Sequence, residues 1–184
     1  MKPLTFRSLT LMLMAIAFAT NQKSHAASLQ VGSIPPDAGL TGEHGGMLDG
    51  KTWDYREFLG RVQLIFYVDP DEREKGEALE DRLKVEHFPV EDVHSSAVIN
   101  MAATGLPNFM IGMSLSSKQK KFPHATYAKD FSRQLVKTWG LQDDAYNFII
   151  LDRKGTVAYV KSGKLTDDEI DRIVTKIKAL IAAK

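Results

Sequence analysis

Two short, nearly continuous apolar runs constrain the fold more than any other feature of this sequence. Residues 62–68 (Val-Gln-Leu-Ile-Phe-Tyr-Val) and 147–151 (Asn-Phe-Ile-Ile-Leu) are rich in β-branched and aromatic side chains. Runs of this length and composition are typical of strands that are buried on both faces. They therefore predict a central sheet that is covered by a layer of structure on each side.

The segments around these runs show helix signals. Asp69-Pro70 is followed by acidic residues, which predicts a helix that begins after residue 69 and runs to about residue 86. Thr166 and Glu169 have capping-box spacing, and apolar residues then recur with helical period up to residue 181. We expect two further helices, over residues 109–122 and 131–139.

The remaining segments complete an α/β pattern. Residues 93–101 and 125–129 predict two more strands, and 156–161 predicts a hairpin partner for 147–151. Residues 28–43 predict an irregular arm, and Asp49-Gly50 predicts a short N-terminal hairpin. The length of 184 residues suits one such domain. The expected fold is an α/β sandwich with a mixed central sheet flanked by helices.

The first 26 residues have the layout of a secretory signal peptide. Lys2 and Arg7 precede an apolar run over residues 9–19, and Ser24-His25-Ala26 places small residues where a signal peptidase reads them. The run is too short to span a membrane. We expect cleavage after Ala26, a single domain over residues 27–184, a periplasmic location and no stable membrane insertion after cleavage.

Composition removes several classes of function. The chain has no cysteine, which excludes disulfides, thiolate metal sites and thiol–disulfide or peroxidase chemistry. The 158 residues after the leader carry 21 basic and 23 acidic side chains, so nucleic acid is not an expected partner. Histidines at 44, 87, 94 and 124 lack zinc-site spacing. No cofactor is expected.

Motifs at residues 129–130 (Lys-Asp), 139–141 (Trp-Gly-Leu) and 148–155 (Phe-Ile-Ile-Leu-Asp-Arg-Lys-Gly) resemble those of the thioredoxin-like fold in its peroxiredoxin-type form. Within that fold, the leader and the motifs at residues 50–53 (Gly-Lys-Thr-Trp), 98–100 (Val-Ile-Asn), 151–155 (Leu-Asp-Arg-Lys-Gly) and 161–169 resemble the YtfJ family of small bacterial periplasmic proteins. The resemblance implies the thioredoxin-like fold. It implies no established biochemical role.

The chain departs from redox-active members of that fold at two places. They carry a reactive cysteine just after the first core strand, where this chain has Asp69-Pro70-Asp71. They also carry a cis-proline before the penultimate strand, where residues 142–146 contain no proline. The resemblance therefore implies a fold that has lost its thiol chemistry.

We predict a non-catalytic binding module that uses this edge for an unknown periplasmic protein or small ligand. The candidate partner-facing residues are Asp69, Pro70, Asp71, Asp144 and Tyr146. One alternative is an enzyme or metal-binding protein that holds a cation on an acidic rim of Asp69, Asp71, Asp143 and Asp144. Another is a structural subunit of an envelope complex. Capping of a helix start also explains the acids at 69–74.

Two features of the segment 109–124 complete the set of hypotheses. Phe109, Met110 and Met113 have helical spacing and are predicted to pack in the core. The lysines at 118, 120 and 121 precede Phe122. They are interpreted as a solvated helix end, with contact to RNA or to anionic lipid as the alternative.

Overall fold

The computed structural model describes residues 28–183, so the predicted leader, residues 1–26, lies outside the described part of the chain. A mixed six-stranded sheet forms the centre, in the order β1-β4-β3-β2-β5-β6. β2, β3 and β4 are mutually parallel, and the other three strands run antiparallel to their neighbours. The strands are β1 (Gly45–Met47), β2 (Val62–Val68), β3 (Val93–Asn100), β4 (Thr126–Asp130), β5 (Tyr146–Leu151) and β6 (Val157–Ser162).

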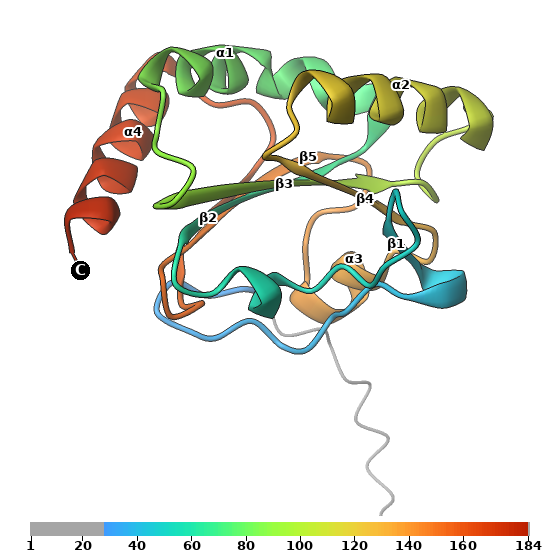
Figure 1. Cartoon of the computed structure of the whole chain (residues 1–184), viewed down its shortest axis with the longest axis horizontal. Coiled ribbons are helices and arrows are strands. Elements are labelled where there is room, and N and C mark those ends of the chain that lie inside the picture. Colours follow the sequence, from blue (N-terminus) through green and yellow to red (C-terminus); the bar gives the residue numbers. More distant parts are fainter. Residues whose placement is uncertain (1–27, 184) are drawn as a thin grey trace, which may run out of the picture.

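Helices cover both faces of this sheet, as predicted. One face carries α1 (Glu77–Glu86), α2 (Asn108–Lys121) and α4 (Asp167–Ala182), and α3 (Gln134–Trp139) lies on the opposite face with the N-terminal segment (Figure 1). The connections β2-α1-β3 and β3-α2-β4 join parallel strands, so both place their helix over the sheet. Within residues 28–183, no helix is long and apolar enough to cross a membrane.

The helix starts follow their capping residues. The Asp69 carboxylate accepts a hydrogen bond from the Asp71 N–H at 2.9 Å, with Pro70 in the first turn. The chain then forms a 3₁₀ helix over Pro70–Gly76, and the α-helix begins only at Glu77, later than predicted. The capping box at the start of α4 is present as predicted.

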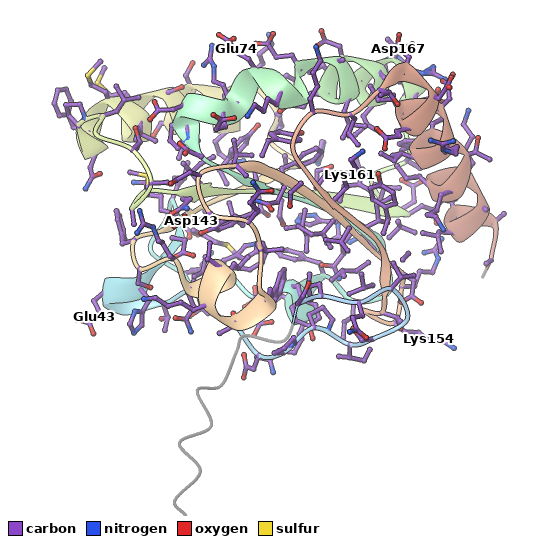
Figure 2. All side chains as sticks on the ribbon, turned by 180° about the vertical axis from the view of Figure 1, so that it is seen from behind. Glu43, Glu74, Asp143, Lys154, Lys161 and Asp167 are labelled. Atoms are coloured by element: carbon purple, nitrogen blue, oxygen red, sulfur yellow. The ribbon has the colours of Figure 1, made fainter. Side chains whose placement is uncertain are left out.

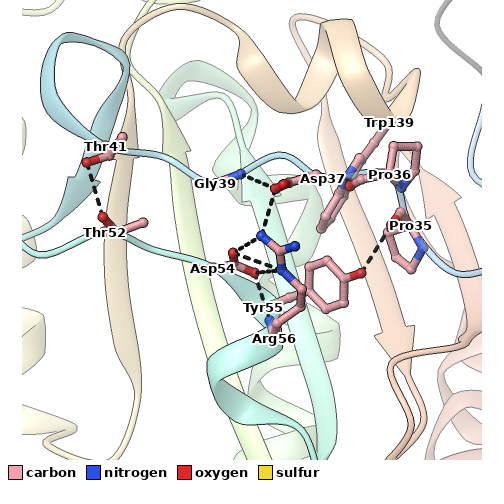
Figure 3. Close-up of polar contacts among 10 residues, drawn as sticks. All are labelled: Pro35, Pro36, Asp37, Gly39, Thr41, Thr52, Asp54, Tyr55, Arg56 and Trp139. Carbon is pink, nitrogen blue, oxygen red and sulfur yellow. Dashed lines mark hydrogen bonds and ion pairs between the residues drawn. The ribbon is translucent and has the colours of Figure 1, made fainter.

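The N-terminal arm, residues 28–43, is irregular but firmly attached to the core. The Tyr55 hydroxyl donates to the Pro35 carbonyl at 3.1 Å, and the Trp139 indole N–H donates to the Pro36 carbonyl at 2.8 Å (Figure 3). The Tyr55 and Trp139 rings pack edge to face, with centroids 5.8 Å apart. The arm therefore closes one side of the core that lies under α3.

The predicted N-terminal hairpin is present as a tight turn around Asp49-Gly50. The Gly50 N–H donates to the Met47 carbonyl at 3.0 Å, and the Met47 N–H donates to the Lys51 carbonyl at 2.8 Å. The first arm of this turn, β1, pairs with β4 and forms one edge of the sheet. The turn thereby attaches the N-terminal segment to the main sheet.

The two faces of the sheet are packed unequally at β3. Side chains that point toward α3, such as His94, Ser96 and Val98, are buried, whereas Ser95, Ala97 and Ile99 point toward α1 and α2 and are only half-buried. β3 has a hydrogen-bonded strand on each side. The residues of such a strand are normally covered, so incomplete burial here marks a gap beneath the helices.

Candidate functional site

The edge predicted to face a partner lies where β2 ends. The Asp69 N–H donates to the Ala145 carbonyl at 3.0 Å, which brings the loop before β5 against the start of the 3₁₀ helix. Asp69 is only 3% exposed. Burial raises the pKa of its carboxyl group, and the negative charges of Asp71 and Asp144 act in the same direction. Asp71 and Asp144 themselves are exposed.

Tyr146 does not belong to this surface, and its prediction as a partner-facing residue is corrected. The side chain is fully buried, and burial raises the pKa of its hydroxyl group. Its ring lies directly against Gly76, where an added Cβ would come within 2.0 Å of the ring atoms. Tyr146 is the first residue of β5, and its side chain points under α1 because Val68 and Tyr146 are paired across the sheet. It is therefore a core residue.

The remaining acid of the predicted rim, Asp143, is held by the protein itself. The Asp143 carboxylate accepts a hydrogen bond from Asn100 at 2.9 Å and forms an ion pair with Arg133, with 3.1 Å between Oδ2 and Nε. Glu74 points outward from the helical layer, whereas Asp143 lies at the level of the sheet (Figure 2). Among residues 28–183, no three His, Cys, Asp or Glu side chains are placed to hold a metal ion.

A second polar network fixes the ends of the parallel strands. The Tyr67 hydroxyl donates to Asp130 Oδ2 at 3.1 Å. The same carboxylate, which is fully buried, accepts hydrogen bonds from the backbone N–H groups of Ser132 and Leu135. A buried carboxylate needs such donors to offset its desolvation. These groups hold the turn into α3 and leave little hydrogen-bonding capacity for a ligand.

A cavity lies elsewhere in the described part of the chain, between the sheet and the helices α1 and α2. Its volume is about 940 Å³. Its floor consists of side chains from β2, β3, β4 and the residue before β4, namely Leu64, Phe66, Val68, Val93, Ser95, Ala97, Ile99, Tyr127 and Ala125. Its walls come from α1, from α2 and from the segments that follow them, namely Leu83, Phe88, Val90, Met110, Ile111, Leu115 and Phe122.

Side-chain size explains why this cavity stays open. Ser95 and Ala97 occupy the middle of the floor, and neither is long enough to reach the helices. Leu79 is the one buried residue of α1, and Ile111 and Leu115 are the two of α2. Both helices therefore contact the core through few side chains, and the space between them is left unfilled.

The polar groups of the cavity are mostly basic. Arg73, Lys84, Lys118 and Lys121 line it, together with one acid, Glu80. Burial raises the pKa of Glu80, and the nearby Lys118 and Lys84 partly oppose this shift. Lys84 also forms an ion pair with Asp81, with 2.8 Å between Nζ and Oδ1. Asp81 is exposed and does not line the cavity. The rim as a whole favours a negatively charged group.

The prediction that Phe109, Met110 and Met113 pack in the core is wrong. Their exposed fractions are 68%, 51% and 70%. The buried face of α2 is instead the i, i+4 pair Ile111 and Leu115, so the apolar spacing was assigned to the wrong side of the helix. Met110 lines the cavity, and Phe109 and Met113 extend the apolar surface outward from it.

Sequence reasoning did not find the cavity, although one signal was present. In the segment 93–100, the side chains facing the helical layer include Ser95 and Ala97, where a covered central strand normally carries larger apolar residues. Small residues at alternate positions of a central strand indicate a close approach of another element or an unfilled space. The position of the helices decides between these two possibilities, and the local sequence does not determine that position.

Comparisons with known proteins agree with this fold. The family model described as "Bacterial protein of unknown function (YtfJ_HI0045)" matches residues 37–180. A relative from Escherichia coli K12, described as "Uncharacterized protein YtfJ", is 24% identical over 165 residues, which cover 85% of this chain and 89% of the relative. An uncharacterized protein from Haemophilus influenzae is 26% identical over 134 residues, which cover 71% of this chain and 72% of the relative.

Solved structures show the same architecture at low identity. A putative thiol:disulfide interchange protein DsbE from Chlorobium tepidum superposes with a TM-score of 0.60 at 18% identity, covering 84% of this chain and 99% of that one. A peroxiredoxin-like protein from Aquifex aeolicus gives a TM-score of 0.57 at 19% identity, with coverage of 85% and 90%. These likenesses show the fold alone. The chain thus belongs to the YtfJ family of bacterial proteins of unknown function and has a thioredoxin-like fold without cysteine.

Proposed function

We propose that this chain is an exported, non-catalytic binding protein whose ligand site is the cavity between α1, α2 and the sheet. The observation that carries the proposal is the incomplete burial of the floor at β3. Ser95, Ala97 and Ile99 remain accessible although β3 is paired on both sides and lies beneath two helices. Apolar surface left accessible in this way is stabilised when an apolar ligand covers it.

The dimensions of the cavity suit a small molecule. Ligand pockets in proteins commonly have volumes of about 300–1,000 Å³ and are lined by apolar side chains with a few polar groups at the margin. The cavity of about 940 Å³ lies within this range, and its floor is apolar apart from Ser95 and the Tyr127 hydroxyl. A binding role therefore agrees with both the volume and the lining.

A non-catalytic role is supported by the chemistry of the sequence and of the strand ends. Thiol–disulfide exchange needs a thiolate, and the chain has no cysteine. Where β2, β3 and β4 end, Tyr67, Asn100 and Asp130 are engaged in hydrogen bonds within the protein. These groups position the local backbone, which accounts for their presence without a reaction.

Export is supported by the leader pattern in residues 1–26. The test is to express the full chain in a Gram-negative host, fractionate the cells and measure the intact mass of the protein. We expect a periplasmic product that lacks residues 1–26. A full-length product that stays in the cytoplasm would overturn this part of the proposal.

The binding role is tested with a neutral apolar dye, N-phenyl-1-naphthylamine, whose fluorescence rises when it leaves water. We expect saturable binding of one dye molecule by the chain 27–184. The double variant Ser95→Leu/Ala97→Leu fills the floor and is expected to abolish binding. Its melting temperature should be unchanged or higher, because the added methyl groups become buried.

The matched control is Ala78→Leu, which adds the same apolar group to an exposed position of α1 outside the cavity. It should bind the dye like the unchanged protein. Absence of saturable binding by the unchanged chain would refute the proposal. Equal binding by the folded floor variant would also refute it, because the dye would then occupy another place.

A further inference from the structure

We infer that the ligand of this cavity is a single-chain amphiphile with an anionic head, whose aliphatic chain lies on the sheet and whose head contacts Lys118 and Lys121. This inference rests on the proposed binding role of the cavity and adds the chemical class of the ligand. Fatty acids and lysophospholipids share this chemistry. Three properties of the described residues lead to it.

The first property is that the floor of the cavity offers almost no hydrogen-bonding groups. The backbone of β3 is paired with β2 on one side and with β4 on the other, so the floor cannot pair with a peptide backbone. Ser95, Ser114 and Tyr127 supply the few hydroxyl groups of the lining. A buried peptide would leave its own N–H and C=O groups unsatisfied at a cost of several kcal/mol, whereas an aliphatic chain has no such groups.

The second property is an apolar surface that continues from the cavity to the outside. Leu106 and Met110 line the cavity, and Met113 follows Met110 by three residues on α2, with Phe109 beside them. All four are more than 40% exposed. Residues three or four apart on a helix are neighbours, so Phe109, Met110 and Met113 form one contiguous patch on α2. Such patches mark sites of apolar contact, and this one provides a path for an aliphatic chain.

The third property is the charge of the rim. Lys118 and Lys121 are three residues apart and therefore lie on the same side of α2, close to its C-terminal end. Arg73 and Lys84 line the cavity as well, and Glu80 is its one acidic lining residue. A carboxylate or phosphate at this rim would lie near four basic side chains and one acidic side chain.

The test compares ligands that share a chain and differ in the head. Displacement of N-phenyl-1-naphthylamine from the chain 27–184 is measured with oleate, oleamide, oleoyl-lysophosphatidylglycerol and oleyltrimethylammonium. We expect oleate to bind about tenfold more tightly than oleamide, which corresponds to about 1.4 kcal/mol. The cationic amphiphile should bind most weakly. If the lysophosphatidylglycerol binds as tightly as oleate, the ligand is identified as a lysophospholipid. If oleate binds more tightly, the ligand is identified as a fatty acid.

Charge variants separate the head from the chain. Lys118→Gln/Lys121→Gln should remove most of the preference for oleate over oleamide, measured as the ratio of the two affinities for the same variant. Lys120→Gln/Lys154→Gln, with both lysines outside the lining, should keep that preference. Equal affinity for oleate and oleamide would overturn the anionic head while dye binding still supports the cavity. Failure of both dye and oleate to bind would overturn both proposals.

Discussion

Replacement of His94 by glutamine is expected to remove a large part of the acid sensitivity of this protein. His94 lies on β3 and is 5% exposed. Its ring stacks on Phe58, with centroids 3.8 Å apart, and its Nε2 shares a hydrogen bond of 3.1 Å with the Thr126 hydroxyl. Burial lowers the pKa of His94 from 6.5 to about 4, and the positive charge of Arg61 acts in the same direction.

The sign of the effect follows from proton linkage. Between about pH 6.5 and pH 4, the unfolded chain binds a proton at His94 and the folded protein does not. Stability is therefore retained above pH 6.5 and lost as the pH falls toward 4. Each pKa unit corresponds to 1.36 kcal/mol. The shift makes His94 responsible for a loss of about 3 kcal/mol in the free energy of unfolding across this range.

The measurement is urea unfolding of the chain 27–184 at a series of pH values from 7 to 4. His94→Gln is expected to lower stability at pH 7, because the stacking on Phe58 is lost. It should also reduce the loss in free energy of unfolding between pH 6.5 and pH 4 by about 3 kcal/mol relative to the unchanged protein. His124→Gln, at an exposed position, is the control and should leave the pH profile unchanged.

The prediction concerns how the free energy of unfolding changes with pH. It therefore does not depend on how much stability the substitution costs at neutral pH. If His94→Gln and the unchanged protein lose stability in parallel between pH 6.5 and pH 4, then His94 does not titrate below its ordinary range. In that case the ring is accessible to water, and the packing of Phe58 over β3 described above is incorrect.

Three further outcomes follow from local structure. Gly76→Ala should destabilise the fold by about 1–3 kcal/mol, because its Cβ would overlap the Tyr146 ring. Gly112→Ala should be neutral or stabilising in the same urea titration, because its Cβ would make only an ordinary contact with Lys129 Nζ, at 3.6 Å. Thr166→Ala should cost about 1 kcal/mol through loss of the capping box with Glu169, measured by thermal unfolding. Millimolar Ca²⁺ should not shift the melting temperature, and a rise of several degrees would revive the acidic-rim alternative.

The sequence was most informative where a local rule and the tertiary structure agree. The capping box at Thr166 and the apolar period of residues 170–181 predicted α4 because capping and burial of one face depend on nearby residues. The runs at 62–68 and 147–151 predicted central strands because both of their faces are buried. These signals were enough for the α/β class and for a mixed sheet.

The features that the sequence did not predict depend on distances between elements. The sequence places Tyr146 in the loop 142–146 at the predicted partner-facing edge, yet its pairing with Val68 directs the ring under α1. The helical spacing of Phe109 and Met113 predicts core positions, but that spacing does not determine which side of α2 meets the sheet. The sequence does not predict the cavity for the same reason, because the cavity depends on the distance between α2 and Ala97.

Methyl NMR with a bound fatty acid tests the central claim most directly. The isoleucine methyl groups of the chain 27–184 are labelled, and oleate is added below its micellar concentration. We predict intermolecular nuclear Overhauser effects between the aliphatic chain and Ile99 and Ile111, which line the cavity. None should reach Ile149 or Ile173, which are buried elsewhere in the core. Absence of contacts to Ile99 and Ile111 at saturating oleate would contradict the assignment of this cavity as the ligand site.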